Sequence, residues 1–353
     1  MNPTAEGTGT MTAGVTTAAT QSGTDQITGT AERGTPALSV NGARREIDGR
    51  AIVANATFEV LEGELFVLVG PSGCGKSTLL RVIAGLDPAG SGHIALAGRD
   101  VTRALPEHRR IGLVFQDHAL FPHRRIDQNI AFGIAHLDRR ERRRRVDELL
   151  ELVRLPGMAK RYPHELSGGE QQRIALARAL APDPAVVLLD EPFASLDPSL
   201  RDEVRAEVVG ALRARGAAAV LVTHDRDEAL ALGDRIAVMS DGNILQIGRP
   251  DEVYDWPVDR FVAEFMGEAS FLPEANGMVV MARPHDLGLS LGGDDVVVDR
   301  KYLGATWRYL LRRPDGTTLR VEQAASPSAP RVEIGTRCTV SVVADHHLHR
   351  LPA

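Results

Sequence analysis

The segment at residues 67–80, VLVGPSGCGKSTLL, constrains the fold of this chain more than any other part of the sequence. An apolar run enters a glycine-rich loop of the pattern GxxxxGKS, and helix-compatible residues follow as far as Gly85. Such a loop turns its backbone N–H groups toward phosphate oxygens, aided by the positive end of the next helix. The order strand, loop, helix predicts a nucleotide site in which Lys76 reaches the β- and γ-phosphates and Ser77 binds Mg²⁺. The residues expected around the phosphates are Gly70, Pro71, Ser72, Gly73, Cys74, Gly75, Lys76, Ser77 and Thr78.

The run VVLLDEP at residues 186–192 adds two carboxylates at the end of a second buried strand. Because parallel strands bring their carboxyl ends to one edge of a sheet, Asp190 is expected near the phosphates and the metal, with Glu191 as the general base. Two acidic residues at a strand end also fit a simple helix cap. Beside a phosphate loop the catalytic interpretation is favoured, because phosphoryl transfer needs a metal anchor and a group that orients water.

Apolar runs and helical patterns alternate through the middle of the sequence. The runs at residues 185–189 and 218–222 flank a helical segment, and residues 235–248 form two β-rich runs around an Asp-Gly turn. This alternation predicts an α/β fold with a mostly parallel sheet. The helical pattern of residues 117–180 indicates an inserted helical subdomain, in which the basic run at residues 139–145 is expected to be a solvated helix face.

Composition changes along the chain and divides it into three parts. Residues 1–36 are rich in Thr, Gly and Ala and have no apolar segment behind a basic start, so we expect a disordered tail and not a signal peptide. The α/β domain is expected over residues 37–270. Short alternating strands in residues 275–353 predict a small all-β, OB-like domain.

The overall composition excludes several classes of protein. A chain of 353 residues that is 43% hydrophobic has enough apolar residues for about two domains. Its formal net charge of −6 argues against a generally basic nucleic-acid binder. No apolar run approaches the roughly 18 residues needed to span a bilayer. The two cysteines do not make a disulfide framework and fit a reducing compartment.

A third motif, LSGGEQQR at residues 166–173, precedes an amphipathic helix. Its serine and glycines present a hydroxyl and backbone N–H groups at a helix N-terminus, which fits an anion site or a plain cap. Together with the glycine-rich loop, VVLLDEP, SLD at residues 195–197 and THD at residues 223–225, the motif resembles the ATPase subunits of ABC transporters in order and spacing. The resemblance covers about residues 37–270 and implies a P-loop ATPase domain that includes an antiparallel β-subdomain.

This resemblance implies that two such subunits pack head to tail, with each ATP between the glycine-rich loop of one and the LSGGEQQR motif of the other. Gln116 matches the glutamine that joins the metal and the attacking water to the helical subdomain, and His224 matches the histidine that contacts the γ-phosphate. Asp197 matches a loop that communicates across the dimer. The implied catalytic residues are Glu191, His224 and Gln116; the metal ligands are Ser77, Gln116 and Asp190; and the residues facing the partner's ATP are Ser167, Gly168, Gly169 and Glu170.

By the same resemblance, ATP and Mg²⁺ bind together, closure of the dimer follows ATP binding, and hydrolysis to ADP and phosphate reopens it. The motion would act on transmembrane permease subunits, so the chain is expected at the cytoplasmic face of the membrane as a peripheral subunit. An extracytoplasmic solute-binding protein would be an indirect partner, and nucleic acid is not expected as one.

Two positions depart from the family pattern. Relatives usually place an aromatic residue before the second strand to stack on adenine, and counting back from the Glu62-Gly63-Glu64 turn places Ile47 there. Weaker adenine stacking is therefore expected. After ALFPH, relatives commonly have an apolar and a small polar residue, whereas this chain has Arg124-Arg125. This segment lies near the groove that receives a permease helix, so a compensating acid on the permease is expected.

The segments at residues 261–273 and 281–289 resemble the connector and first strands of the TOBE-like β-domain in importer ATPases. The segment FMGEASFLP is most similar to the corresponding segment of the ferric-iron import subfamily. Ferric iron is therefore the first expected solute, ahead of polyamine, quaternary amine or thiamine. His285 lacks companion ligands and is expected to be a surface or packed residue and not a metal ligand.

Two further hypotheses concern other roles for the chain. A soluble ABC ATPase of DNA repair, chromosome structure or translation would usually carry a coiled-coil insertion, zinc-binding cysteines or two cassettes, and the sequence has none of these. A regulatory role is also open, in which the β-domain senses a small anion or a partner and inhibits hydrolysis. This role is compatible with transport.

Overall fold

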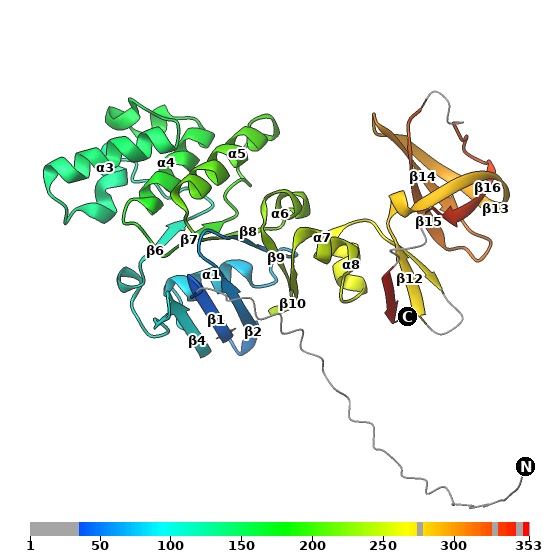
Figure 1. The fold of residues 1–353 in the computed structure, drawn as a ribbon, viewed down its shortest axis with the longest axis horizontal. Coiled ribbons are helices and arrows are strands. Elements are labelled where there is room, and N and C mark those ends of the chain that lie inside the picture. Colours follow the sequence, from blue (N-terminus) through cyan, green and yellow to red (C-terminus); the bar gives the residue numbers. More distant parts are fainter. Residues whose placement is uncertain (1–34, 274–277, 327–330, 344–348, 353) are drawn as a thin grey trace, which may run out of the picture. The chain divides into compact units, whose positions relative to one another are not determined.

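The computed structural model describes residues 35–273, 278–326, 331–343 and 349–352. The predicted tail therefore lies outside the described residues, apart from Thr35 and Pro36. Within the described ranges the chain forms an α/β domain followed by all-β structure (Figure 1). The helices are α1 (Lys76–Ala84), α2 (Ile126–Ile130), α3 (Arg139–Leu152), α4 (Gly168–Leu180), α5 (Pro198–Arg215), α6 (Arg226–Leu232), α7 (Pro250–Asp255) and α8 (Arg260–Met266), with short 3-10 helices η1 (Pro106–His108), η2 (Ala131–Ile134), η3 (Met158–Lys160), η4 (Pro163–Glu165) and η5 (Pro284–Asp286).

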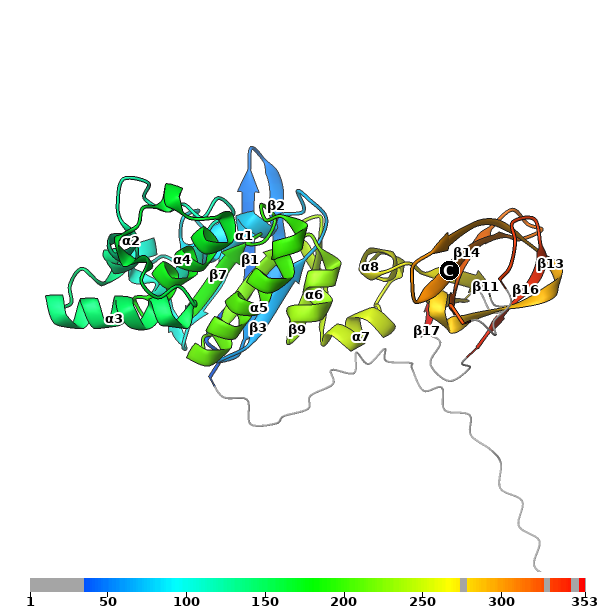
Figure 2. The ribbon, with the colours of Figure 1, turned by 90° about the horizontal axis from the view of Figure 1, so that it is seen from above.

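One mixed sheet forms the centre of the α/β domain (Figure 2). Its strand order is β5-β4-β1-β2-β10-β9-β3-β8-β7-β6. β6, β7, β8, β3 and β9 pair in parallel, as the alternating sequence pattern predicts. β1, β2, β4 and β5 pair antiparallel and form the expected β-subdomain. The strands are β1 (Leu38–Ile47), β2 (Arg50–Val60), β3 (Leu65–Val69), β4 (Ser91–Leu96), β5 (Arg99–Asp100), β6 (Ile111–Val114), β7 (Val186–Asp190), β8 (Ala219–Thr223), β9 (Arg235–Ser240) and β10 (Asn243–Gly248).

The central strand β3 is buried on both faces, which is why its sequence is apolar throughout. Alternate side chains of a strand point to opposite faces. Leu65, Val67 and Val69 belong to a core that includes residues of α3, α4 and α5. Phe66 and Leu68 belong to a second core that includes residues of α1 and β1. The sheet is therefore covered on both sides, and only its edges are open to a ligand.

The turn between β9 and β10 packs against the glycine-rich loop. Asp241 and Gly242 have positive φ angles of 46° and 78°, as the predicted Asp-Gly hairpin turn requires. The backbone N–H of Gly242 donates to the carbonyl oxygen of Cys74 at 3.0 Å. A Cβ atom at Gly242 would lie 2.8 Å from the carbonyl oxygen of Ile52 on β2. The turn therefore holds the loop beside the β1–β2 hairpin.

The expected helical subdomain is present as α2, α3 and α4 with the short helices between them. Val146, Leu149 and Leu150 of α3 are buried in the core that also contains Leu65, Val67 and Val69 of β3. The basic run on α3 is mostly exposed, as predicted, but Arg142 and Arg145 are partly buried. The side chain of Arg145 is only 15% exposed and its guanidinium lies 3.5 Å from the Asp183 carboxylate, so this residue is a packing contact between α3 and the segment after α4.

The all-β part contains two antiparallel sheets, in the orders β11-β12-β17 and β15-β14-β13-β16. Tyr309, Leu311 and Val321 contribute to a small core between these strands. The predicted Pro-Asp-Gly hairpin joins β14 to β15. The strands are β11 (Ser270–Pro273), β12 (Met278–Ala282), β13 (Leu287–Tyr302), β14 (Thr306–Arg312), β15 (Thr318–Ala324), β16 (Arg337–Val342) and β17 (His349–Pro352). β11 precedes the expected start of this domain at residue 275, and the predicted boundaries stay predictions.

The buried residue Arg283 connects the all-β part to α7 and α8. Its guanidinium donates to the carbonyl oxygens of Ala263 at 2.8 Å and Glu268 at 3.3 Å, and it lies 4.1 Å from the centre of the Tyr254 ring. Burial lowers the pKa of Arg283. None of the helices within the described ranges is long and apolar enough to cross a membrane.

Candidate nucleotide site

Four neighbouring parallel strands bring the predicted site residues to one edge of the sheet. The order β3-β8-β7-β6 is continuous, and the carboxyl ends of parallel strands share an edge. The glycine-rich loop follows β3, His224 follows β8, Asp190 ends β7, and Gln116 lies two residues beyond β6. The topology therefore assembles residues that are up to 154 positions apart in the sequence, from Gly70 to His224.

Glycine is required at two places in the loop. A Cβ atom at Gly70 would lie 2.1 Å from the carbonyl oxygen of Met239, and one at Gly75 would lie 2.4 Å from that of Ile52. Gly75 also has a φ of 108°, which disfavours any side chain. Its position directly before α1 exposes the first N–H groups of that helix to a ligand. The loop thus has the geometry that the phosphate-binding motif predicts.

The side chain of Lys76 lies within the loop. Its ammonium donates to the carbonyl oxygens of Gly70 at 2.8 Å and Pro71 at 2.9 Å, and the residue is only 4% exposed. The Cys74 sulfur lies 3.9 Å from the Lys76 ammonium. Burial raises the pKa of the Cys74 thiol, and the charge of Lys76 opposes this increase. Both acceptors are neutral carbonyl oxygens, so neither of these two contacts pairs the ammonium with an opposite charge.

The Ser77 hydroxyl donates to an oxygen of the Asp190 carboxylate at 2.8 Å. Hydroxyl and carboxylate oxygens are the hard ligands that Mg²⁺ prefers, and Mg²⁺ sites of this kind use one or two protein ligands plus phosphate oxygens and water. Burial raises the pKa of Asp190, the bond from Ser77 opposes this, and the charge of Glu191 adds to it. A cation at this pair would favour the ionised carboxylate. The donor set therefore fits Mg²⁺.

The carboxylate of Glu191 lies 3.1 Å from Nδ1 of His224. Glu191 has a φ of 45°, which is uncommon for a residue with a side chain, and its N–H donates to the Val222 carbonyl oxygen at 3.0 Å. Such backbone conformations concentrate at functional sites. The acid and the histidine that were predicted separately are therefore brought into contact.

Ser167 caps α4 and forms a reciprocal pair with Glu170. The Glu170 carboxylate accepts from the Ser167 N–H and hydroxyl, both at 2.8 Å, and these bonds lower the pKa of Glu170. The capping interpretation of this motif is confirmed, and it leaves Gly168 exposed. A side chain at Gly169 is excluded because its Cβ would lie 2.8 Å from Val204. The hydrogen bonds of Ser167 stay within its own helix and do not reach the glycine-rich loop.

Gln116 and Asp197 are both exposed. Asp197 stands at the N-terminus of α5, where its carbonyl oxygen accepts from the N–H groups of Leu200 and Arg201. Ile47 is the last residue of β1 and is 41% exposed. Its hairpin is the one whose Ile52 carbonyl lies against Gly75, so Ile47 is placed on the element that borders the loop.

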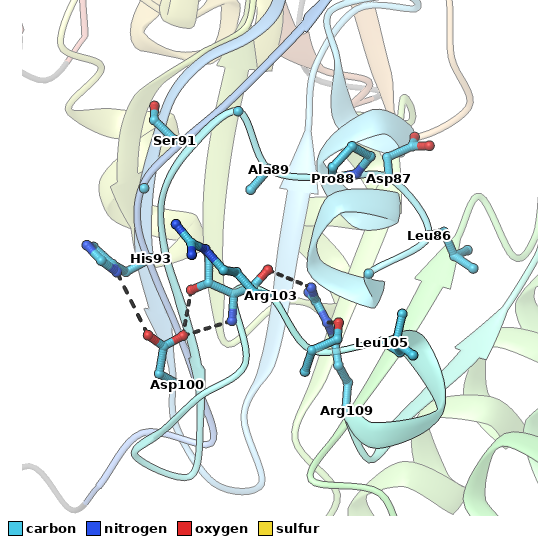
Figure 3. A pocket seen from close by; sticks show the side chains of 15 residues that line it. Leu86, Asp87, Pro88, Ala89, Ser91, His93, Asp100, Arg103, Leu105 and Arg109 are labelled. Atoms are coloured by element: carbon cyan, nitrogen blue, oxygen red, sulfur yellow. Dashed lines mark hydrogen bonds and ion pairs between the residues drawn. The ribbon is translucent and has the colours of Figure 1, made fainter.

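A separate hollow lies in the α/β domain (Figure 3). It measures about 870 Å³ and is lined by the end of α1 and the β4–β5 hairpin. Arg109 closes its base by donating to the carbonyl oxygens of Val82 and Ile83, and His93 stands 4.0 Å from Asp100 at its rim. None of the predicted site residues lines this hollow.

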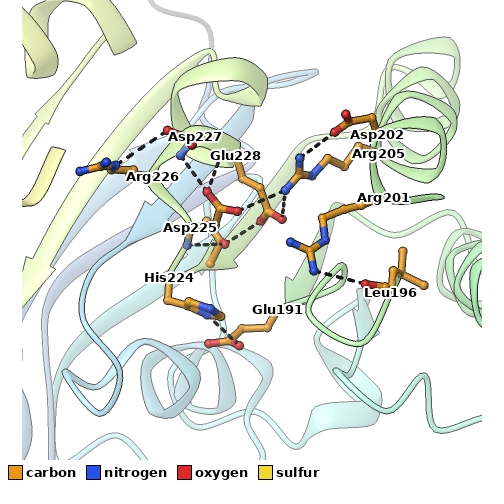
Figure 4. A network of polar contacts seen from close by, with 11 residues as sticks. Glu191, Leu196, Arg201, Asp202, Arg205, His224, Asp225, Arg226, Asp227 and Glu228 are labelled. Atoms are coloured by element: carbon orange, nitrogen blue, oxygen red, sulfur yellow. Dashed lines mark hydrogen bonds and ion pairs between the residues drawn. The ribbon is translucent and has the colours of Figure 1, made fainter. Parts of the chain in front are cut away.

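Sequence reasoning missed a group of residues behind His224. Arg205 of α5 contacts Asp225 and Glu228 around the His224 loop (Figure 4). Arg205 lies 20 positions from Asp225, and no spacing rule indicates such a pair. The only signal in the sequence is the acidic cluster that follows THD.

Comparisons with known proteins agree with this geometry. A family model described as ABC transporter matches residues 53–194, and one described as TOBE domain matches residues 280–349. A sulfate/thiosulfate import ATP-binding protein of Chromobacterium violaceum is 43% identical over 82% of this chain and 82% of that protein. A spermidine/putrescine import ATP-binding protein of Marinobacter nauticus is 38% identical over 79% of this chain and 85% of that protein. An Fe(3+) ions import ATP-binding protein of Rhizobium meliloti is 40% identical over 82% and 85%.

Solved structures show the same fold. The cbiO1 protein of Clostridium perfringens, part of an ABC transporter complex, is similar with a TM-score of 0.57 and 30% identity over 62% of this chain and 90% of that chain. A dimeric ATP-binding cassette bound to ADP and phosphate is similar with a TM-score of 0.54 and 30% identity over 60% of this chain and 98% of that chain. The resemblance seen in the sequence motifs is thus confirmed: this chain belongs to the ATP-binding subunits of ABC importers, which are ATPases.

Proposed function

We propose that this chain binds and hydrolyses Mg²⁺-ATP at the edge of strands β3, β8, β7 and β6, and that hydrolysis drives solute import. The observation that carries the proposal is the presence of two functional pairs at one sheet edge. Ser77 with Asp190 is suited to the metal, and Glu191 with His224 is suited to water activation. Ser77 belongs to the glycine-rich loop itself, and Glu191 directly follows Asp190, the partner of Ser77.

Each residue has a distinct part in the proposed reaction. The glycine-rich loop and the Lys76 ammonium hold the phosphates in line for attack. Glu191 orients a water molecule and accepts its proton, while His224 holds Glu191 and contacts the γ-phosphate. Gln116 joins this site to the helical subdomain. When bound, Mg²⁺ supplies positive charge to the β- and γ-phosphate oxygens.

The proposed site is completed by a second copy of the chain, packed head to tail. Ser167, Gly168, Gly169 and Glu170 of one subunit would meet the γ-phosphate held by the other, with Asp197 beside the interface. The α4 N-terminus supports this because Gly168 is exposed and Ser167 is bonded only within its own helix. One relative's solved structure is itself described as dimeric.

The proposed membrane partners are permease subunits, which would hold the chain at the cytoplasmic face of the membrane. The helical subdomain carries a surface suited to such docking. Arg124 lies 5.3 Å from the ring centres of both Phe121 and Phe132, and Phe132 is 53% exposed. An aromatic pair with one exposed ring and a guanidinium over it fits an apolar helix with an acidic residue. A solute-binding protein outside the membrane would act through the permease.

Ferric iron is our first proposal for the solute, based on the FMGEASFLP segment. Polyamines are a second proposal, with quaternary amines and thiamine after them. Sulfate joins these candidates because one similar protein is named as a sulfate/thiosulfate importer subunit. The predicted site contacts nucleotide and not solute, so the permease decides among these ions. Uptake assays with the permease that binds this chain separate the candidates directly.

A regulatory role of the all-β part is a second proposal, favoured by the Arg283 contacts with α7 and α8. Arg283→Ala would weaken the connection between the two parts without touching the nucleotide site. Altered ATPase activity at unchanged ATP affinity would support regulation, and unchanged activity would contradict it.

The experiment that tests the proposed function is reconstitution of the full chain with its permease in vesicles. ATP hydrolysis and solute uptake should both be lost in Lys76→Ala, which removes the phosphate-binding ammonium. Arg337→Ala, which breaks an exposed ion pair with Asp294 in the all-β part, is the matched control and should retain both. Uptake that continues with Lys76→Ala would contradict the proposal.

A further inference from the structure

Arg205 is the centre of a polar cluster behind the His224 loop (Figure 4). Its guanidinium contacts the carboxylates of Glu228, Asp225 at 3.3 Å and Asp202 at 2.9 Å. The Arg205 side chain is 16% exposed and that of Glu228 is 6% exposed. Ion pairs that are withdrawn from solvent in this way hold their geometry more firmly than exposed pairs.

The same cluster fixes both residues that flank His224. The Thr223 hydroxyl donates to Glu228 at 2.6 Å, and the Asp225 N–H donates to the Thr223 hydroxyl at 3.0 Å. The Asp225 carboxylate also accepts from the N–H groups at the start of α6. The backbone on either side of His224 is therefore held by Arg205, directly through Asp225 and indirectly through Glu228.

Arg205 also connects this loop to the start of α5, the helix that begins directly after Asp197. One turn before Arg205, the Arg201 guanidinium donates to the Leu196 carbonyl oxygen at 3.2 Å. The first turns of α5 thus contact the Asp197 loop through Arg201 and, one turn later, the His224 loop through Arg205. Because a helix moves as a rigid element, a shift of one loop reaches the other.

We infer that Arg205 is a positioning residue that fixes the His224 loop to α5 and so keeps His224 in contact with Glu191. This inference rests on the proposed role of His224 in hydrolysis. Arg205 itself is separated from His224 by Asp225 and Glu228 and acts through them. The two pairs that it supports, Thr223–Glu228 and His224–Glu191, lie on either side of the same backbone turn.

Removal of Arg205 would leave the Glu228 carboxylate buried with the Thr223 hydroxyl, the other side chain of the described ranges that donates to it. A buried carboxylate without its countercharge becomes protonated or moves toward water. Either change releases Thr223 and Asp225, and with them the His224 backbone. The glycine-rich loop follows β3, whereas the His224 loop follows β8, so the glycine-rich loop is not part of the Arg205 cluster.

Steady-state kinetics on the full chain provide the first test. Arg205→Ala should lower kcat about tenfold with KM for ATP changed less than about twofold, a loss in the range of coupling between contacting residues. Arg213→Ala is the matched control, because Arg213 lies on the same helix and makes an exposed pair with Asp234 at 3.4 Å. Arg205→Lys keeps the charge but has one donor nitrogen in place of three, so its kcat should fall between those of the other two variants. Parent-like kcat in Arg205→Ala would overturn the inference.

A double-variant comparison separates positioning from general destabilisation. If Arg205 acts through His224, Arg205→Ala should lower kcat little or not at all in a His224→Ala background. An undiminished loss there would overturn the inference. Full activity of His224→Ala alone would instead contradict the proposed role of His224.

Amide hydrogen exchange provides a readout that does not depend on turnover. In the nucleotide-free chain, Arg205→Ala should speed exchange at residues 223–228 at least about tenfold, while Arg213→Ala leaves it unchanged, because local opening sets the exchange rate. Exchange in residues 65–69 should match the parent in both variants. Parent-like exchange at residues 223–228 in Arg205→Ala would overturn the inference whatever the kinetics show.

Discussion

Glu191 Oε2 and His224 Nδ1 lie 3.1 Å apart, although the two residues are 33 positions apart in the sequence. Their strands, β7 and β8, are direct neighbours, so the pair forms at the shared carboxyl edge. The positive φ of Glu191 turns its side chain at the strand end, where the N–H is held by Val222. The proposed hydrolysis of ATP depends on the contact between Glu191 and His224.

Glu191→Gln keeps the size of the side chain and removes its ability to accept a proton. We expect ATP to bind with parent-like affinity while turnover falls at least about 100-fold, the usual contribution of a general base. The variant should accumulate as a closed dimer with ATP. Fluorescent-nucleotide binding, phosphate release and light scattering check the three outcomes, and hydrolysis at the parent rate would contradict the role of Glu191.

Asp190→Asn should stabilise the chain in the absence of metal. Burial raises the pKa of Asp190, so its ionised form costs stability above the pKa that the unfolded chain shows. At pH 7.5 without Mg²⁺, the variant's Tm should exceed the parent's by roughly 2 °C. The difference should shrink as the pH falls through the pKa of Asp190, because the protonated parent resembles the amide.

The same variant should lose Mg²⁺-dependent ATP hydrolysis, since the amide cannot supply the negative charge that a cation needs. Thermal scans over a pH series, run with and without Mg²⁺, check both statements. A parent that is more stable than Asp190→Asn without metal at pH 7.5 would show that burial does not disfavour the ionised form.

Alkylation of Cys74 should block ATP binding, because the added group would lie among the loop's N–H donors. Burial raises the pKa of this thiol, so modification at pH 7.5 should be at least about tenfold slower than for an exposed thiol and should accelerate with pH. ATP should protect Cys74. Cys338 is the internal control, since it is also buried with a raised pKa and lies outside the loop. Peptide mapping that finds equal protection of both thiols, or of neither, contradicts this prediction.

Ile47→Tyr should tighten ATP binding about two- to tenfold, the range expected for one added aromatic stacking contact. The position is exposed and lies on the hairpin that borders the loop. Ile47→Leu provides the control for size and apolar character. Nucleotide titrations check the result, and equal ATP affinity in Ile47→Tyr and Ile47→Leu would place the adenine elsewhere.

The sequence was sufficient to predict the fold class, and it also predicts a set of residues around the phosphates. Each motif combines a local structure with a chemical group, as in the apolar strand that ends at Asp190 or the glycine turn before Lys76. Such motifs can be recognised in the sequence alone because their residues are close together along the chain. Parallel pairing then brings them together, and pairing follows from the alternation of strands and helices.

The contacts that sequence reasoning missed are made by side chains from segments with no local relationship. Arg205, Arg283 and Arg109 are charged residues, and a charge in a sequence predicts exposure. All three are instead withdrawn from solvent against carboxylates or carbonyl oxygens. Their burial depends on where helices pack, which motifs do not specify. The hydrogen bond from the Lys76 ammonium to the Gly70 carbonyl oxygen is likewise a contact that the sequence motif does not specify.

We propose that a second subunit completes each nucleotide site, and vanadate photocleavage tests this arrangement most directly. Vanadate with ADP occupies the γ-phosphate position, and ultraviolet light then cuts the backbone that touches it. Tagged Lys76→Ala, which cannot hold nucleotide in its own loop, is mixed with untagged parent before trapping. We predict a cut in the tagged chain at Ser167 and none at residues 70–78. If the untagged chain were cut at Ser167 and at residues 70–78 while the tagged chain stayed intact, one subunit would supply the whole site and the proposal would be contradicted.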